Sequence, residues 1–110
     1  MLNRDQLITP VKLEHGKTDI PELGGEVGIR QLMITEKSKD ITLWARQTKA
    51  NMQMLIARWI VVCLIDDDGN RLLNDSDIEL IAQWPAPMAE RVYSDILEVN
   101  VHLDGEDLTK

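Results

Sequence analysis

The strongest structural signal in this chain is MQMLIARWIVVC, residues 52–63. Its large apolar side chains recur at intervals of three and four positions, the spacing that gathers them on one face of an α-helix. That face consists of Met52, Leu55, Ile56, Trp59, Ile60 and Cys63. Further apolar side chains lie off that face, so the end of the predicted helix is expected to be buried on all sides; they are Val61, Val62 and Leu64.

The chain before this helix predicts a β-hairpin. Apolar and polar residues alternate loosely from 10 to 20 and again from 27 to 33, which is the pattern of half-buried strands. Between these ranges, residues 21–25 read Pro-Glu-Leu-Gly-Gly. Glycine permits the positive φ angles that a tight turn needs, so the two strands are expected to pair across this turn.

A second helix is predicted between the hairpin and residue 52. Thr35 is placed to cap its start, and the helix is expected to run to about Arg46 with Leu43 and Trp44 facing inward. The break near residues 47–51 is poorly marked. The sequence therefore leaves open whether residues 36–65 form one helix or two.

Two more helices are predicted after residue 63. Residues 66–70, Asp-Asp-Asp-Gly-Asn, are turn formers that stop the preceding helix. Asn74 or Asp75 is placed to cap a short helix over 76–83, and Pro85 ends it. The last helix is indicated by an apolar stripe at helical spacing, made of Ala89, Val92, Tyr93, Ile96 and Val99.

Together these elements predict an α+β fold, with an N-terminal β-hairpin followed by three to four α-helices in one compact domain. A length of 110 residues is about that of one ordinary domain. We expect residues 1–9 to be a flexible leader, residues 10–101 the single domain, and residues 102–110 a flexible acidic tail.

Composition excludes several classes of protein. The formal net charge is −7, and an acidic surface repels phosphate backbones and anionic lipids, so we expect no nucleic-acid partner and no membrane partner. The basic residues look scattered, and a partner with a basic or apolar surface fits better.

The longest apolar run, 59–65, is too short to span a bilayer, and the opening residues do not resemble a signal peptide. Cys63, the single cysteine, is expected to be a buried thiol, which is compatible with a reducing cytoplasm.

The best candidate for chemistry is a calcium-like pattern, and it fails. Asp66, Asp68 and Asn70 fit positions one, three and five of a calcium-binding loop. Position six requires glycine but holds Arg71, and position twelve requires glutamate but holds Asp77. An ordinary helix-ending turn is the better interpretation, so no metal site is predicted.

The remaining candidates for chemistry are also weak. His15 and His102 have no second ligand or nucleophile at a useful spacing. The glycines at 24, 25 and 28 lack the Lys-Ser/Thr of a phosphate-binding loop. We therefore predict no catalytic residue and no cofactor, and we expect a protein that is not an enzyme.

Four residues are candidates for contacting a partner protein. Trp84 stands beside a helix-ending proline and is the preferred aromatic anchor. Met54 falls off the apolar stripe of its helix, and Val61 lies beyond it. Ile29 belongs to the second strand of the hairpin, whose edge is expected to be open for pairing. Trp59, by contrast, is expected to be core.

Several ordered segments resemble one known family. Residues 21–32, PELGGEVGIRQL, are similar to the E-L-G-G-x-V-x-V-R-E-L-T stretch of tail assembly chaperones from long-tailed (siphovirus-type) phages and prophages. Residues 57–70 resemble the family's apolar helix running into D-E-D-G, and residues 73–79 resemble its F-T-D-E-D-V-E, with Leu73 in place of phenylalanine. The last part of the likeness runs from Pro85-Ala86 to Val99-Asn100, which resembles the family's L-P-A-A…L-N pattern. The likeness covers roughly residues 5–100 and is weakest over 37–53.

The resemblance implies a function that composition does not. Such proteins bind the long helical tape measure protein in the cytoplasm of the bacterial host and keep it soluble while the tail assembles. They tend to self-associate, and many are also made as a longer form, by programmed frameshifting, that recruits tail tube protein.

Two other classes of function stay open. One is a small intracellular interaction or regulatory module unrelated to tails, such as an adaptor or an antitoxin-like binder. The other is a small enzyme whose titratable residues cluster only in the folded chain. Neighbouring genes separate these classes, because the chaperone function expects tail tube and tape measure genes beside this one.

Overall fold

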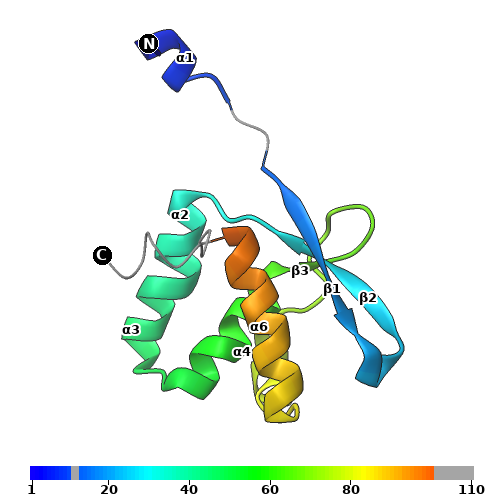
Figure 1. The fold of residues 1–110 in the computed structure, drawn as a ribbon. Coiled ribbons are helices and arrows are strands. Elements are labelled where there is room, and N and C mark those ends of the chain that lie inside the picture. Colours follow the sequence, from blue (N-terminus) through cyan, green and yellow to red (C-terminus); the bar gives the residue numbers. More distant parts are fainter. Residues whose placement is uncertain (11–12, 101–110) are drawn as a thin grey trace.

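The computed structural model describes residues 1–10 and 13–100. The chain combines a small antiparallel sheet with several helices in an α+β arrangement, as predicted (Figure 1). The strands are β1 (His15–Ile20), β2 (Gly25–Arg30) and β3 (Leu64–Ile65). The helices are α1 (Arg4–Leu7), α2 (Ile34–Glu36), α3 (Trp44–Thr48), α4 (Met52–Cys63), α5 (Ile78–Ile81) and α6 (Ala86–Asn100). Single turns of 3₁₀-helix occur at Pro21–Leu23 and Asp75–Asp77.

The hairpin is present, and its turn uses one of the two predicted glycines. β1 and β2 are antiparallel, with His15 opposite Arg30 and Ile20 opposite Gly25. Gly24 adopts a φ of 78°, the left-handed region that glycine enters without steric cost. Gly25 is already the first residue of β2. The register therefore follows from the turn, as in other short hairpins.

The third strand was not predicted, and it changes the sheet. β3 pairs antiparallel with β2, with Leu64 opposite Ile29, so the order of strands is β1-β2-β3. β2 is consequently the central strand. The prediction that the second hairpin strand offers an open edge was wrong; β1 occupies the outer edge instead.

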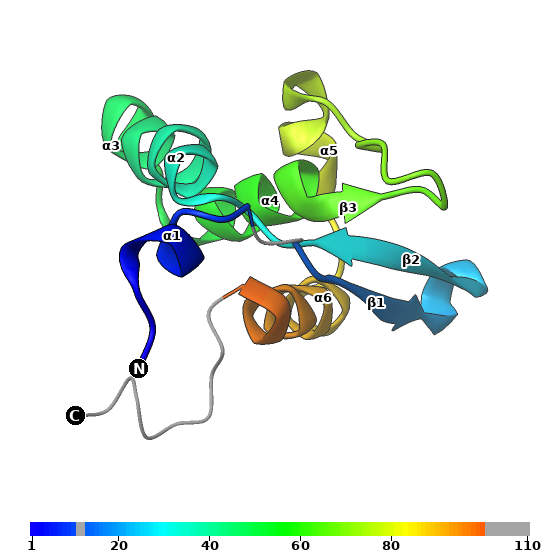
Figure 2. The ribbon, with the colours of Figure 1, turned by 90° about the horizontal axis from the view of Figure 1, so that it is seen from above.

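One face of the sheet packs against α6 (Figure 2). Thr18, Ile20 and Ile29 lie on this face and are buried, because alternate residues of a strand share a face. A Cβ at Gly16 would stand 2.5 Å from the Val99 side chain, so glycine lets the strand and the helix approach closely. The opposite face carries exposed charged residues, including Lys17 and Glu26.

α4 runs through the centre of the molecule, as its apolar pattern predicts. Every residue from Ala57 to Cys63 is buried, and Ile60 and Val61 have no exposed surface. Trp59 is 4% exposed and belongs to the core, as expected. Asn51 caps the helix by accepting a hydrogen bond from the Met54 amide at 2.9 Å.

Arginine side chains occupy the other end of α4. The last carbonyl groups of a helix have no partner within it and carry partial negative charge. Arg30 Nε donates to the Val62 carbonyl at 3.0 Å, and Arg71 Nε donates to the Val61 carbonyl at 2.8 Å. Two cations therefore satisfy these carbonyls at the point where the chain passes directly into β3.

Residues 34–63 form two helical segments rather than one. The first is continuous from α2 through a π-helical stretch, Lys37–Leu43, into α3. It ends at Lys49, which adopts a φ of 54°, while the Ala50 amide donates to the Ala45 carbonyl at 3.0 Å. This is a Schellman helix end with lysine in the position usually held by glycine.

Two details of this first segment differ from the predictions. Met33, not Thr35, is the residue before the helix, and its amide donates to the Glu36 carboxylate at 3.0 Å. Leu43 is 42% exposed rather than inward-facing, whereas Trp44 packs partly against the core. The π-helical stretch has a wider turn than an α-helix, so it rotates the following side chains out of the predicted phase.

The last helices agree with the sequence pattern. Asn74 is the cap of the short helix, accepting a hydrogen bond from the Ser76 amide at 3.0 Å. α6 buries Met88, Val92 and Ile96. Its last residue, Asn100, donates to the Arg30 carbonyl at 3.1 Å and accepts from the Leu32 amide at 2.7 Å. The end of α6 is thereby fixed beside the start of α2.

The proposed division into a leader, one domain and a tail stays a prediction, because residues 11–12 and 101–110 lie outside the described residues. α1, within the expected leader, holds no buried residue. Across residues 1–10 and 13–100, no helix combines the length and the apolar character that a membrane crossing requires.

Candidate partner-binding site

An apolar groove lies between the first half of α4, the end of α5 and the start of α6. Its volume is about 290 Å³. Alanines occupy positions where longer side chains would fill the space, at Ala57, Ala82, Ala86 and Ala89. The groove is therefore a consequence of small side chains at the contact between helices.

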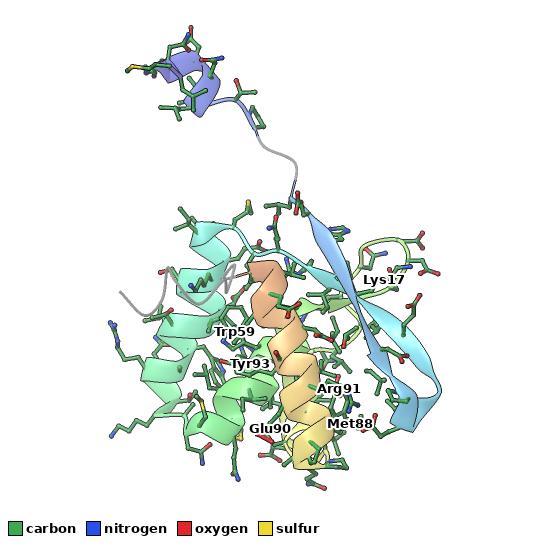
Figure 3. All side chains as sticks on the ribbon, in the orientation of Figure 1. Lys17, Trp59, Met88, Glu90, Arg91 and Tyr93 are labelled. Atoms are coloured by element: carbon green, nitrogen blue, oxygen red, sulfur yellow. The ribbon has the colours of Figure 1, made fainter. Side chains whose placement is uncertain are left out.

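Larger apolar side chains and one acid complete the walls of the groove. Met52 and Trp84 lie at the rim; Met52 is 62% exposed and Trp84 is partly buried. The acid is Glu90, which Figure 3 labels in the first half of α6. Its neighbour Arg91 pairs with Glu22 at the hairpin turn. An apolar hollow with a few polar groups at its rim is the usual form of a site that accepts an apolar side chain or a helix face.

The structure brings one of the four predicted contact residues into this groove. Trp84 lines it, on the link between α5 and α6. Met54 is partly buried and packs against the core. Ile29 and Val61 have no exposed surface, so neither presents an atom to a partner in this structure. Ile29 lies on the covered face of the central strand, and Val61 lies where α4 is enclosed on all sides.

Met52 was not among the four predicted contact residues, because its place on the apolar stripe assigned it to the core. The missed signal is its position: it is the first residue of α4, where the helix leaves the core. The alanines could not have been singled out, since alanine is common in helices and carries no chemistry of its own.

A second hollow of about 310 Å³ lies on the charged face of the sheet. Its lining includes His15, Lys17 and Glu26, and the loop after β3 covers one side of it. Lys17 and Glu26 form an ion pair at 3.3 Å. In the described residues this hollow holds no serine or cysteine beside the histidine, so it does not assemble a nucleophile and its base.

The calcium-like stretch forms a turn. The Asp66 carboxylate accepts hydrogen bonds from the Asp68 and Asn70 amides, both at 2.9 Å. Its oxygen is thus used to hold the loop closed. Within residues 1–10 and 13–100, no three His, Cys, Asp or Glu side chains gather as a metal site would require. His102 lies outside the described residues.

The pKa values of Cys63 and Asp75 are shifted by burial and by contacts that hold the fold together. Burial raises the pKa of the Cys63 thiol to about 12, so the thiol stays protonated at neutral pH. The hydrogen bond from Arg71 lowers the pKa of Asp75 most strongly; burial opposes this effect, and the hydrogen bond from Arg58 lowers the pKa further. Arg58, 4% exposed, also donates to the Asp40 carbonyl at 2.7 Å and lies 5.0 Å from the centre of the Trp44 ring.

The chain folds as a small α+β protein with an apolar groove between α4, α5 and α6. No family model and no curated protein matches this chain. Among solved structures, the fold is similar to the tail assembly chaperone of bacteriophage HK97, with a TM-score of 0.59 over 87% of this chain and 90% of that one. The sequences are 13% identical. The expected likeness to tail assembly chaperones is therefore confirmed in the fold.

Proposed function

We propose that this chain is a tail assembly chaperone of a long-tailed phage or prophage, and that it binds apolar helical segments of a tape measure protein. The observation that carries the proposal is the Trp84-lined groove on a fold similar to that of the HK97 tail assembly chaperone. The role needs no chemical step, only a surface that covers apolar residues until the tail forms.

The groove suits a helical client. An amphipathic helix places apolar side chains at positions three and four apart, and one such side chain fits a hollow of this size. Trp84 supplies a large apolar contact at the rim, and the flexible Met52 can adapt to different client side chains. Varied segments of a long client can therefore share one site.

Other parts of the proposal come from the family resemblance. We propose action in the cytoplasm of the bacterial host, self-association, and a longer frameshifted form that recruits tail tube protein. We propose no cofactor, metal, nucleic acid or membrane partner. Sedimentation of the purified chain measures self-association, and the nucleotide sequence near the end of the gene reveals whether a slippery site exists.

The main test is co-expression with the tape measure protein encoded nearby. We expect the client to become soluble and to co-purify with this chain. Trp84→Ala should weaken client binding on the order of thirtyfold, the loss of one aromatic anchor. Because Trp84 also packs against the core, Ala82→Glu provides a second variant: Ala82 is exposed at the groove, so a glutamate there blocks the site without disturbing the interior.

The matched control is Ser94→Glu, which adds the same charge to an exposed position of α6 outside the groove. It should leave client binding unchanged. Undiminished binding by both folded groove variants would remove the groove from the proposal. A client that stays insoluble beside the unmodified chain would remove the chaperone function itself, and the interaction-module alternative would then be preferred.

A further inference from the structure

The basic residues are not scattered once the chain is folded. Six of them form ion pairs: Arg4, Lys17, Arg30, Arg58, Arg71 and Arg91. Within the described ranges 1–10 and 13–100, the other four have no ion-pair partner, and all lie between residues 37 and 49. They are Lys37, Lys39, Arg46 and Lys49. Among the described residues, the basic side chains without an ion-pair partner thus lie on one helical segment of a protein whose net charge is −7.

All four side chains belong to exposed residues, whereas the two acids of the same segment, Glu36 and Asp40, are half-buried. Glu36 also pairs with Arg30 at 2.8 Å, which neutralises its charge locally. The local surface is therefore positive.

Exposed apolar side chains accompany these charges. Leu43 lies four positions after Lys39 and three before Arg46, so the three are neighbours on the helix surface. Ile34, at the start of α2, is 89% exposed. We define Ile34, Lys39, Leu43, Arg46 and Lys49 as the basic face. Figure 1 shows α2 and α3 on one side of the molecule, well apart from the hairpin.

We propose that the basic face is a second docking surface and that its occupant is an acidic, amphipathic helical segment of a partner protein. Charge complementarity requires the partner segment to be acidic, because the basic side chains attract carboxylates. The exposed leucine and isoleucine contact the apolar stripe of the same helix. At physiological ionic strength charges are screened beyond about 8 Å, so a short segment meets this local positive surface rather than the net charge of the molecule.

The same face is a poor site for nucleic acid. A long phosphate backbone extends past the face onto the surrounding acidic surface, and the described part of the segment presents no exposed aromatic ring for bases to stack on, since Trp44 is partly buried against Arg58. A short acidic helix avoids both problems.

Fluorescence anisotropy with a designed probe tests the proposal on the full chain. The probe is a labelled helical peptide of about 20 residues, roughly the length of a short helix, with leucine on one face and glutamate on the other. Its twin carries lysine in place of glutamate. We expect the glutamate peptide to bind, the lysine twin not to bind, and the affinity to fall when salt rises from about 0.15 M to about 0.5 M.

Charge reversal locates the site. Lys39→Glu with Arg46→Glu should weaken binding on the order of tenfold. The control, Arg4→Glu with Lys17→Glu, changes the net charge equally on other elements and should have little effect. Circular dichroism checks that each variant is folded. We expect both to fold, because the four substituted residues are exposed.

Three results would overturn the proposal. The lysine twin could bind as tightly as the glutamate peptide, or the charge reversal at Lys39 and Arg46 could leave peptide binding unchanged. The third result is that a thymidine 20-mer binds more tightly than the glutamate peptide and loses binding in the same charge-reversal variant. The groove variant Ala82→Glu should bind the probe normally. The basic face and the groove can therefore fail independently, because each variant alters only one of the two surfaces.

Discussion

The helical segment from Ile34 to Thr48 and α4 follow one another in the chain, but they differ in how many of their side chains are buried. α4 buries every residue from Ala57 to Cys63, whereas the earlier segment buries Ile41 alone. The arginine of α4 is buried and pairs with Asp75, whereas the basic side chains of the earlier segment are exposed. The comparison indicates that α4 stabilises the fold while the segment before it supplies surface.

The largest expected effect comes from truncating matched side chains in the two helices. Ile60→Ala should lower the free energy of unfolding by about 3 kcal/mol, because it removes a fully buried side chain and leaves a cavity. Leu43→Ala should cost below about 1 kcal/mol, since the leucine is already 42% exposed. Urea denaturation of both variants measures the difference; similar losses would contradict the assignment of stability to α4.

The next effect concerns the ion pair that holds the buried arginine of α4. Asp75→Asn removes the carboxylate shared by Arg58 and Arg71 and leaves the buried Arg58 charge less well paired. We expect a loss of about 1–2 kcal/mol at pH 7, below the usual cost of breaking a buried pair because the Asp75 side chain is 66% exposed and screened by solvent.

The pH dependence of this loss has a definite sign. The pKa of Asp75 is lower in the folded chain than the ordinary aspartate value of 3.8, so the stabilisation is complete above that value and disappears as pH falls through the lower, folded pKa. Denaturation at pH 7 and in strong acid should show the difference between wild type and Asp75→Asn shrinking in acid. A difference that stays constant would mean that the carboxylate charge is not involved.

The smallest effect is expected at the junction itself. Lys49 adopts a left-handed conformation that costs a non-glycine residue energy, and glycine removes that strain while losing more entropy on folding. Lys49→Gly should therefore raise the free energy of unfolding by about 0.5 kcal/mol. Lys49→Ala tests the same position without glycine's freedom. The melting temperature of the glycine variant should be higher than that of the alanine variant. The reverse order would mean that the backbone is not strained at Lys49.

The sequence predicted the elements whose pattern is long and periodic. The stripe of α6, the stripe of α4 apart from the exposed Met52, and the Gly24 turn form as expected, because apolar spacing and glycine geometry act locally. β3 escaped prediction because its two residues, Leu64 and Ile65, continue the apolar run of α4 without a signal. The helix break at Lys49 lies within the range 47–51 considered from the sequence, but it stayed undecided there because it lacks the glycine that usually marks a helix end.

The candidate site was less predictable than the fold. Trp84 could be selected because an aromatic residue beside a proline is conspicuous. Ile29 and Val61 were selected as contact residues although β3 and the packing around α4 cover them. The groove depends on which alanines face one another, and the basic face depends on which cations find partners. Both are properties of tertiary packing that the order of residues does not display.

The position of β3 also bears on how the chain folds. Its partner, β2, lies on the far side of two helical segments in the sequence, so completing the sheet requires closure of a long loop. During synthesis from the N-terminus, the hairpin emerges first and keeps an open β2 edge until α4 and β3 leave the ribosome. A chain proposed to shield another protein from aggregation must therefore pass through a stage in which its own sheet is unprotected.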